Sequence, residues 1–578
     1  MTGTTGRIPR WAIAGLVAAM VFNVAWRWHT IGPTVLSRPF EGRLVRSGAT
    51  EPLDCDEAAY AYMGRRMIRG DVLYRDLTEN KPPLGYWLYG LAVAVGGADE
   101  FAIRVMPIPY ILATIAAVWW IGLTLAGPWA ACLAAFVFGV AVTDPYLFGN
   151  GANLEHFLNL FSVGSLGLFL LARRRSSRRL VVACGVCLGL SALVKQVAAT
   201  HGLVYAAFLL LPDRGDGKAG RSLATRCLDL AALAIGSALP WLASLAVLAA
   251  QGAGHAAYED IVVYARAMVT DLPAAPNAPP WYVRLVAGNA DPQGKLPWPF
   301  GATRYYAWWG AGLWPFWLAS LPATARLVSR RSPMIATEAG SEGQHGSSTS
   351  ARASPLLAAW TLSSWLQILL PGQFWQHYYL LAVPGSALAV SIWAVDAIRG
   401  VRSRPVRNSL IAAGLIAALG WSLRIQARDY LGLTPEEITS EFKGGKQWVA
   451  LRTFGRDLAV RAKAWDDPHL FVWGWQSPLF LYSGLDGVSR HFFANELIKA
   501  HATDDHPLVR RWVGEILRDL EARPPAIVLA GDIPFPALRK FLDARYLPSP
   551  ISMSSPDGRG LWVEKGRFGA FHARGASP

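Results

Sequence analysis

Carboxylates, tyrosines and a lysine are concentrated in one polar segment near the N-terminus, LDCDEAAYAYMGRRMIRGDVLYRDLTENKPPLGYWLYG (residues 53–90). Its ionisable and aromatic side chains include Asp54, Asp56, Glu57, Tyr60, Tyr62, Tyr74, Asp76, Glu79 and Lys81. A carboxylate can take the proton from an attacking hydroxyl group. A lysine can hold a phosphate and stabilise the charge that develops as it departs. These residue types therefore suit a transfer reaction on a phosphate-linked substrate, and the structural alternative is a solvated connector with interfacial anchors.

Within this segment, EAAYAYMGRRMIRG has the pattern of an amphipathic helix lying at a membrane interface. Tyr and Met residues fall on one side of it and Arg65, Arg66 and Arg69 on the other. We expect these arginines to contact lipid phosphates.

Three further groups of polar residues interrupt apolar sequence. They contain Asn153, Glu155 and His156 in TDPYLFGNGANLEHFLNLF, Lys195 and Gln196, and Gln373, Gln376, His377 and Tyr378 in PGQFWQHYYLLAVPG. An ionisable residue at such a depth usually faces a polar cavity, because exposing it to lipid costs about 2.5–3.5 kcal/mol. Three structural alternatives stay open: a carboxylate favoured by a helix N-terminus for Glu155, a snorkelling Lys195, and an aromatic belt around Tyr378.

The elements that would position these groups are membrane helices. Of the 578 residues, 53% are apolar and only 16% are charged, which excludes a disordered chain and argues strongly against a wholly soluble enzyme. Runs near the length needed to cross about 30 Å of hydrocarbon recur along the first three quarters of the chain. We predict eleven spans, at 11–28, 102–125, 128–145, 153–172, 180–195, 197–212, 227–250, 305–325, 355–371, 378–398 and 408–425. The CxxC pair Cys184–Cys187 lies inside one of them and is interpreted as small apolar packing.

The net charge of +15 gives the orientation of these spans. Four loops at 172–179, 213–226, 326–352 and 399–407 hold 17 basic and four acidic residues, and with eleven spans all four share the side of the N-terminus. By the positive-inside rule that side is cytoplasmic. The charge is therefore a membrane-topology signal, and no nucleic-acid partner is predicted. Segments 30–100, 251–304 and the tail fall on the opposite, external side.

The tail from 427 to 578 has a different composition, with 20 basic and 18 acidic residues. Helical stretches alternate with the short apolar runs HLFVWGW, PAIVLAG and GLWVEKG, which are typical of strands. We expect an all-α polytopic membrane domain over residues 1–426, followed by a small extracytoplasmic α/β domain over 427–578.

Residues 53–90, with the arginine of FAIRVMPIPY, resemble the first external loop of the GT-C polytopic glycosyltransferases. The nearest branches are the bacterial relatives of protein O-mannosyltransferases and the lipid A aminoarabinose transferase. The family pattern is an acidic pair, a tyrosine, G-x-x-x-Y and Lys-Pro-Pro, which here are Asp56-Glu57, Tyr60, Gly70 to Tyr74, and Lys81-Pro82-Pro83. Glu155, Lys195-Gln196 and HYYLLAVPG are weaker matches.

The resemblance implies an inverting-type transferase that takes a sugar from a polyprenyl-phosphate donor on the external side. It implies Asp56 as general base, Lys81 on the donor phosphate, Glu155 as a second acidic residue, and Glu57 beside or sharing the site. The remaining expected residues are Lys195, Arg104 and His377 for the donor phosphate or lipid, and Tyr60, Tyr74 and Asn153 for substrate. Some relatives bind a divalent metal, but no complete ligand set is visible here, so metal dependence stays open.

The expected partners are the lipid bilayer, the donor and an acceptor glycan, lipid or protein. The Ala/Arg/Gly-rich composition is typical of a high-GC bacterium, so we expect the bacterial inner membrane. The competing hypotheses are a transporter or flippase of lipid-linked saccharides and a structural subunit. No inverted repeat or matched pair of broken spans favours the transporter.

Overall fold

The computed structural model describes residues 8–31, 36–40, 43–47, 50–211, 222–272, 280–282, 284, 312–329 and 353–573, the last range except 403, 444, 464, 495, 504, 532, 534 and 551–559. Much of the predicted external loop 251–304, the start of the predicted span 305–325 and the low-complexity stretch around 335–352 lie outside these residues.

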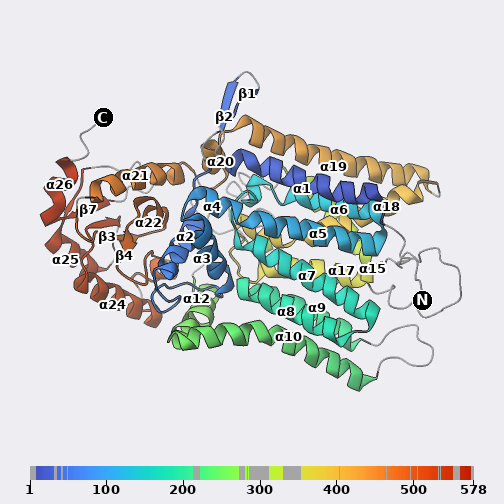
Figure 1. Cartoon of the computed structure of the whole chain (residues 1–578), viewed down its shortest axis with the longest axis horizontal. Helices are drawn as coiled ribbons and strands as arrows, with labels where there is room; N and C mark the ends of the chain where they lie inside the picture. The colour runs from blue at the N-terminus through green and yellow to red at the C-terminus, as the bar shows by residue number, and fades with distance from the viewer. Residues whose placement is uncertain are drawn as a thin grey trace.

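A bundle of apolar helices makes up the larger part of the molecule (Figure 1). Its helices are α1 (Arg10–Ile31), α4 (Glu100–Val105), α5 (Pro107–Ala126), α6 (Pro128–Ala141), α7 (Leu154–Arg175), α8 (Arg178–Val194), α9 (Thr200–Leu210), α10 (Leu223–Ala250), α15 (Trp314–Ser329), α17 (Ala353–Leu369), α18 (Val383–Arg399) and α19 (Pro405–Gly432). Each predicted span overlaps, over its described residues, with one of these helices or with a consecutive pair. Among the described residues, five helical stretches are long and apolar enough to cross a membrane, namely α1, α4–α5, α7, α10 and α19. The chain is thus a multi-pass membrane protein, while the count of eleven spans stays a prediction.

Two helices differ from the predicted spans. The span predicted over 128–145 ends as an α-helix at Ala141, and a loop with one 3-10 turn, Pro145–Leu147, follows to Asn153. Its residues are largely buried, and irregular backbone at membrane depth is tolerated where protein covers it. The span list also omits α3 (Leu84–Gly96), an apolar helix of 13 residues inside the predicted external segment.

Helix α8 packs on α10 through small residues. A Cβ atom at Gly185 would lie 2.4 Å from the Leu233 carbonyl oxygen, and one at Gly189 would lie 2.3 Å from the Ser237 carbonyl oxygen. Close backbone approach through small residues is a usual way for membrane helices to associate. Cys184 is fully buried in this stretch, as expected of apolar packing.

The tail folds into helices around one five-stranded sheet with the order β4-β3-β5-β7-β6. Its strands are β3 (His469–Trp473), β4 (Asp486–Gly487), β5 (Ile527–Ala530), β6 (Tyr546–Pro548) and β7 (Gly560–Glu564), and the three predicted strands are β3, β5 and β7. Strand β3 is parallel to β4 and β5, whereas β7 is antiparallel to β5 and β6. Its helices are α20 (Pro435–Phe442), α21 (Gln447–Ala462), α22 (Pro478–Ser483), α23 (Glu496–Ala500), α24 (Pro507–Ala522), α25 (Pro536–Arg545) and α26 (Phe568–Ala573). Trp512 and Ile516 of α24 pack with Phe471 and Val528 of the sheet in one apolar core.

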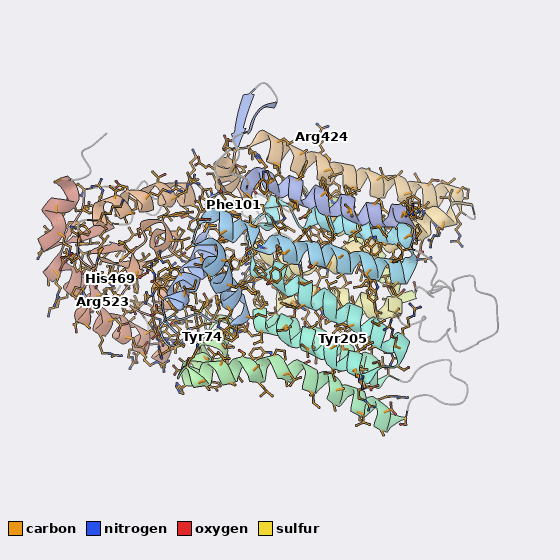
Figure 2. The ribbon with its side chains drawn as sticks, in the orientation of Figure 1. Tyr74, Phe101, Tyr205, Arg424, His469 and Arg523 are labelled. Atoms are coloured by element: carbon orange, nitrogen blue, oxygen red, sulfur yellow. The ribbon has the colours of Figure 1, made fainter. Side chains whose placement is uncertain are left out.

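Helix α2 (Cys55–Ile68) and α3 lie between the bundle and this α/β domain (Figure 1). Short elements complete the junction: the hairpin β1 (Leu36–Phe40) and β2 (Arg43–Ser47), α11 (Gly254–Tyr258), a π-helix at Glu259–Tyr264, α12 (Ala265–Thr270), and 3-10 turns at Pro145–Leu147, Gln196–Ala199 and Gln376–Leu381. Further 3-10 turns lie at Gly400–Arg402 and Lys565–Arg567. Figure 2 shows Tyr74 at this junction, Tyr205 within the bundle, and His469 and Arg523 in the α/β domain. One apolar cluster joins α2, α3 and the start of α7 to β3 and β5, so the junction shares a continuous core.

Candidate active site

Asp56 is the second residue of α2, at the end of the helix that faces the bundle loops. The helix starts here because Asp54 is its N-cap and accepts a hydrogen bond from the Glu57 amide, while Glu57 accepts one from the Asp54 amide. The Asp56 carboxylate is half-buried. In the part of the chain that the structure describes, its one hydrogen-bond donor is the Cys55 thiol, 3.9 Å away. Asp56 thus keeps acceptor capacity for a substrate, at a helix N-terminus that favours the carboxylate.

Glu57 faces the opposite way, into the protein. One of its oxygens accepts from the Ala152 amide at 2.6 Å, and the other lies 2.9 Å from an Arg104 nitrogen. Burial by itself would raise the pKa of Glu57, but Arg104, Lys443 and the backbone donors outweigh it and lower the pKa. Glu57 is therefore a buried anion that ties α2 to α4 and to the loop before α7.

Arg104 is also fully buried and belongs to the same cluster. It donates to the Pro52 carbonyl oxygen at 2.8 Å and pairs with Glu51 at 3.3 Å as well as with Glu57. All of these partners are within the protein. The structure places Arg104 behind α2 and not on an open surface where a lipid phosphate could reach it.

Lys443, directly after α20, completes this charge cluster from the tail. Its ammonium lies 3.2 Å from Glu51, 3.7 Å from Glu57 and 3.9 Å from Asp54, and it is buried. Burial and then Glu57 raise the pKa of Asp54 to about 7. Three carboxylates and two cations therefore balance one another directly behind the residue expected to act as base.

Lys81 lies on the open side of α2. Its ammonium is 3.2 Å from Glu79 and 5.3 Å from the centre of the Tyr60 ring. Burial lowers the pKa of Lys81, but Glu79 and Asp56 raise it by more, so the lysine is a cation. Tyr60 is itself buried against Tyr86 and Tyr89. Tyr60 is thus part of the wall beside Lys81.

Lys195 and Glu155 form a buried ion pair at the junction of α8 and α7. The lysine also lies 4.2 Å from the centre of the Tyr378 ring. Gln196 donates to the Asn80 carbonyl oxygen at 2.9 Å, which fixes this corner next to Lys81.

His377 stacks on Phe148 at 6.0 Å and lies edge-on to Tyr378 at 4.8 Å. Burial, and then Lys195, lower the pKa of His377 to about 3, so its imidazole is neutral and can donate one hydrogen bond.

The predicted residues thus separate into two groups. Contacts link Tyr60 to Lys81, Lys195 to Glu155 and Tyr378, and His377 to Tyr378. Asp56 lies one helical turn before Tyr60 on α2, so we group these residues as one candidate site. Glu57, Arg104, Asn153 and Tyr74 support it from behind. Asn153 donates to the Phe148 carbonyl oxygen at 2.6 Å, and Tyr74 donates to the Lys81 carbonyl oxygen at 2.8 Å.

The expectation for the arginines of α2 is wrong. Arg65 and Arg69 pair with Asp486 of the α/β domain, and Arg66 pairs with Asp71. The tail covers the face of α2 that the composition assigned to lipid. A polar cleft of about 410 Å³ lies at this end of the helix, where Arg66, Arg69 and Arg523 line it. None of the predicted site residues borders this cleft.

Sequence reasoning missed Glu51 and Lys443 as site residues. It singled out Tyr378 and Glu79 as polar groups beside His377 and Lys81 but assigned them no role. Glu51 and Lys443 are 392 positions apart in numbering and have no local pattern. Over the described ranges, no group of three or more His, Cys, Asp or Glu residues is arranged to hold a metal ion. The carboxylates behind Asp56 are neutralised by Arg104 and Lys443, so they do not fit a metal centre.

Comparisons with known proteins find a family model and solved structures of similar fold. Residues 80–243 match the family model of dolichyl-phosphate-mannose-protein mannosyltransferases. The fold is similar to that of ArnT from Cupriavidus metallidurans bound to undecaprenyl phosphate, with a TM-score of 0.53 and 16% identity over 96% of this chain and 98% of that chain. The apo state of the same protein gives a TM-score of 0.52 at the same identity and coverage. No curated protein sequence matches the chain.

ArnT and the mannosyltransferases of the family model are glycosyltransferases. The resemblance based on residues 53–90 is therefore confirmed, because the chain shares the fold of the GT-C membrane glycosyltransferases and matches, over residues 80–243, the mannosyltransferase family model.

Proposed function

We propose that this protein is an integral-membrane glycosyltransferase that moves a sugar, a hexose or a pentose, from a polyprenyl-phosphate donor to an extracytoplasmic acceptor. The acceptor is a glycolipid, a polysaccharide or a protein. The observation that carries the proposal is Asp56, a carboxylate with spare acceptor capacity that lies one helical turn from Tyr60, whose ring lies beside the Lys81 ammonium.

The proposed reaction needs a base for the acceptor hydroxyl and a cation for the departing phosphate. Asp56 accepts the proton of the acceptor hydroxyl while that oxygen forms a bond to the anomeric carbon of the sugar. The bond from the anomeric carbon to the phosphate oxygen breaks, and its electron pair leaves with the polyprenyl phosphate. Attack opposite the leaving group inverts the anomeric centre. The proton ends on Asp56, and the extra negative charge ends on the phosphate.

We propose that Lys81 stabilises the negative charge that develops on the leaving phosphate. It is a half-buried cation whose Glu79 partner leaves two of its three N–H donors for other acceptors. Fixed donors aimed at developing charge in a water-poor site are worth more than in water. Lys195 and the neutral His377 are placed to contribute further donors. The undecaprenyl phosphate bound by the structurally similar ArnT supports a lipid phosphate as the leaving group.

The direction of α7 supports an extracytoplasmic site. This helix begins at Leu154 beside the site and ends in Arg173, Arg174 and Arg175, and its 22 residues span about 33 Å. The basic loops thus lie a membrane thickness away from Asp56. Because basic loops stay cytoplasmic, we place the site and the α/β domain on the extracytoplasmic side. The membrane we propose is the bacterial inner membrane.

A transfer assay with a radiolabelled polyprenyl-phosphate sugar and native membranes as the acceptor source tests the proposal. Asp56→Asn keeps the size of the side chain but removes the base, and we expect transfer to fall by about 10²–10⁴-fold. Asp99→Asn is the matched control, since Asp99 is the exposed N-cap of α4 and asparagine caps a helix equally well.

Two results would contradict the assignment. One is full transfer by the folded Asp56→Asn protein. The other is movement of the label across the membrane with no covalent product, which would favour a flippase.

A further inference from the structure

The segment that leads into Lys81 is held in an unfavourable backbone conformation. Tyr74 has φ of +69° and is fully buried. A bulky residue rarely adopts this left-handed region unless its surroundings impose it. The Tyr74 hydroxyl donates to the Lys81 carbonyl oxygen at 2.8 Å, so the position of Tyr74 sets that of the Lys81 backbone.

Arg490, in the loop after β4, imposes this conformation from the α/β domain. Its guanidinium donates to the Tyr74 carbonyl oxygen at 3.1 Å, and its own carbonyl oxygen accepts from the Thr78 amide at 3.1 Å. Arg490 thus forms two hydrogen bonds with the segment 74–81, one at Tyr74 and one at Thr78, although it lies 416 positions after Tyr74 in the sequence.

Arg490 is itself fixed on the side of its own domain. Its Nε lies 2.9 Å from a Glu515 oxygen of α24, and the Nε2 of His491 lies 2.9 Å from the same oxygen. Burial would raise the pKa of Glu515, but His491 and Arg490 lower it to about 2, which keeps the carboxylate charged. The side chain of Arg490 is only 15% exposed.

A second route runs from Arg490 to the Lys81 ammonium through two acidic residues, Asp260 and Glu79. Asp260 lies 4.0 Å from the Arg490 guanidinium and accepts from the Glu79 amide at 3.2 Å. Glu79 in turn lies 3.2 Å from the Lys81 ammonium. Arg490 therefore supports both the backbone and the charged end of Lys81 without contacting either.

We propose that Arg490 is a positioning residue for the donor phosphate, so that the α/β domain is a working part of the donor site. The inference rests on the proposed function, because it assigns Lys81 to that phosphate. It predicts that a change at Arg490, three residues beyond β4 in a domain outside the bundle, weakens the binding of a membrane lipid.

The experiment measures the binding of undecaprenyl phosphate to the full-length protein in detergent, which needs no knowledge of the acceptor. We expect Arg490→Gln to weaken binding about tenfold, equivalent to about 1.4 kcal/mol. Arg539→Gln is the control, because Arg539 pairs only with Asp543 within α25 among the acidic residues described and is half exposed. Its binding should equal that of the unaltered protein.

Two further variants separate positioning from folding. In a Lys81→Gln background, Arg490→Gln should cause little additional loss, since it acts through Lys81. Tyr74→Phe removes only the hydroxyl that holds the Lys81 carbonyl and should weaken binding in the same direction.

The inference is overturned if Arg490→Gln and Tyr74→Phe both bind the lipid as tightly as the unaltered protein, or if the losses from Arg490→Gln and Lys81→Gln add fully. Failure of the unaltered protein to bind undecaprenyl phosphate would instead overturn the proposed function, and the inference with it.

Discussion

Asp54, Asp56 and Glu57 are neighbours in the sequence but have different surroundings, because side chains of adjacent helical residues point about 100° apart. Asp54 caps α2 and is buried, Asp56 faces the site, and Glu57 faces the interior and Arg104. Side-chain type alone would allow any of the three to act as base. The residue that keeps acceptor capacity among the described contacts is Asp56.

The pH dependence of stability tests the protonation of Asp260, another buried acidic residue. It is almost fully buried; burial raises its pKa to about 8, with Glu79 and Glu259 adding to the rise and Arg490 opposing it. The unfolded chain ionises this group near pH 3.9. Unfolding therefore releases a proton between about pH 4 and 8, and this group makes the free energy of unfolding fall as pH rises through that window.

We expect Asp260→Asn to flatten this pH dependence, because asparagine is neutral throughout and its oxygen can still accept from the Glu79 amide. Melting temperatures of both proteins at pH 5 and pH 8 in the same detergent measure the effect. An equal fall in melting temperature for both proteins would show that Asp260 is ionised in the native state.

At the level of elements, the crossing of α2 and α3 sets the distance between Asp56, the proposed base, and Lys81, the lysine proposed to bind phosphate. Asp56 begins α2, and Lys81 stands just before α3. At the crossing, a Cβ atom at Gly64 would lie 3.0 Å from the backbone of Tyr89 and Gly90. The two helices approach this closely because residue 64 has no side chain.

We therefore expect Gly64→Ala to push α2 away from α3, to lower stability by about 1–3 kcal/mol and to reduce transfer. Gly90→Ala is the matched control on the facing helix. Its Cβ would lie 3.5 Å from the flexible end of Met67, an ordinary contact. Thermal unfolding and the transfer assay compare the two, and equal behaviour of both variants would show that the close crossing is not required.

For the molecule as a whole, the tail packs against the bundle and contacts the residues around the start of α2 (Figure 1). Ser477 donates to the Cys55 carbonyl oxygen at 2.6 Å, and the Leu53 amide donates to the Tyr482 hydroxyl at 3.0 Å. Lys443 adds the cation that balances Glu51 and Asp54. Removing the tail from residue 430 would leave these partners unsatisfied and expose the shared core.

A single substitution reproduces part of that loss. Lys443→Met removes one charge from the buried cluster, and breaking a buried ion pair typically costs about 3–5 kcal/mol. Lys446→Met, three residues later and exposed, is the control and should change stability by less than about 0.5 kcal/mol. Denaturant unfolding in detergent distinguishes them. If Lys443→Met is as stable as Lys446→Met, the cluster does not depend on the tail.

The parts of this protein that depend on local pattern could be predicted from the order of its residues. Apolar runs specify helices because a segment in lipid must satisfy its own backbone hydrogen bonds. The motif around Asp56 and Lys81 was enough to predict the GT-C resemblance, and three of the five strands in the described sheet, β3, β5 and β7, followed from short apolar runs.

The tertiary structure decided what each charged residue contacts. The roles of Glu57 and Arg104 depend on which way α2 and α4 turn toward each other, and the arginines of α2 meet Asp486 instead of lipid. Lys443 and Arg490 reach the site from more than 380 positions away. Periodicity fixes the face of a helix that is apolar, but only the packing of distant segments determines which charges are buried together.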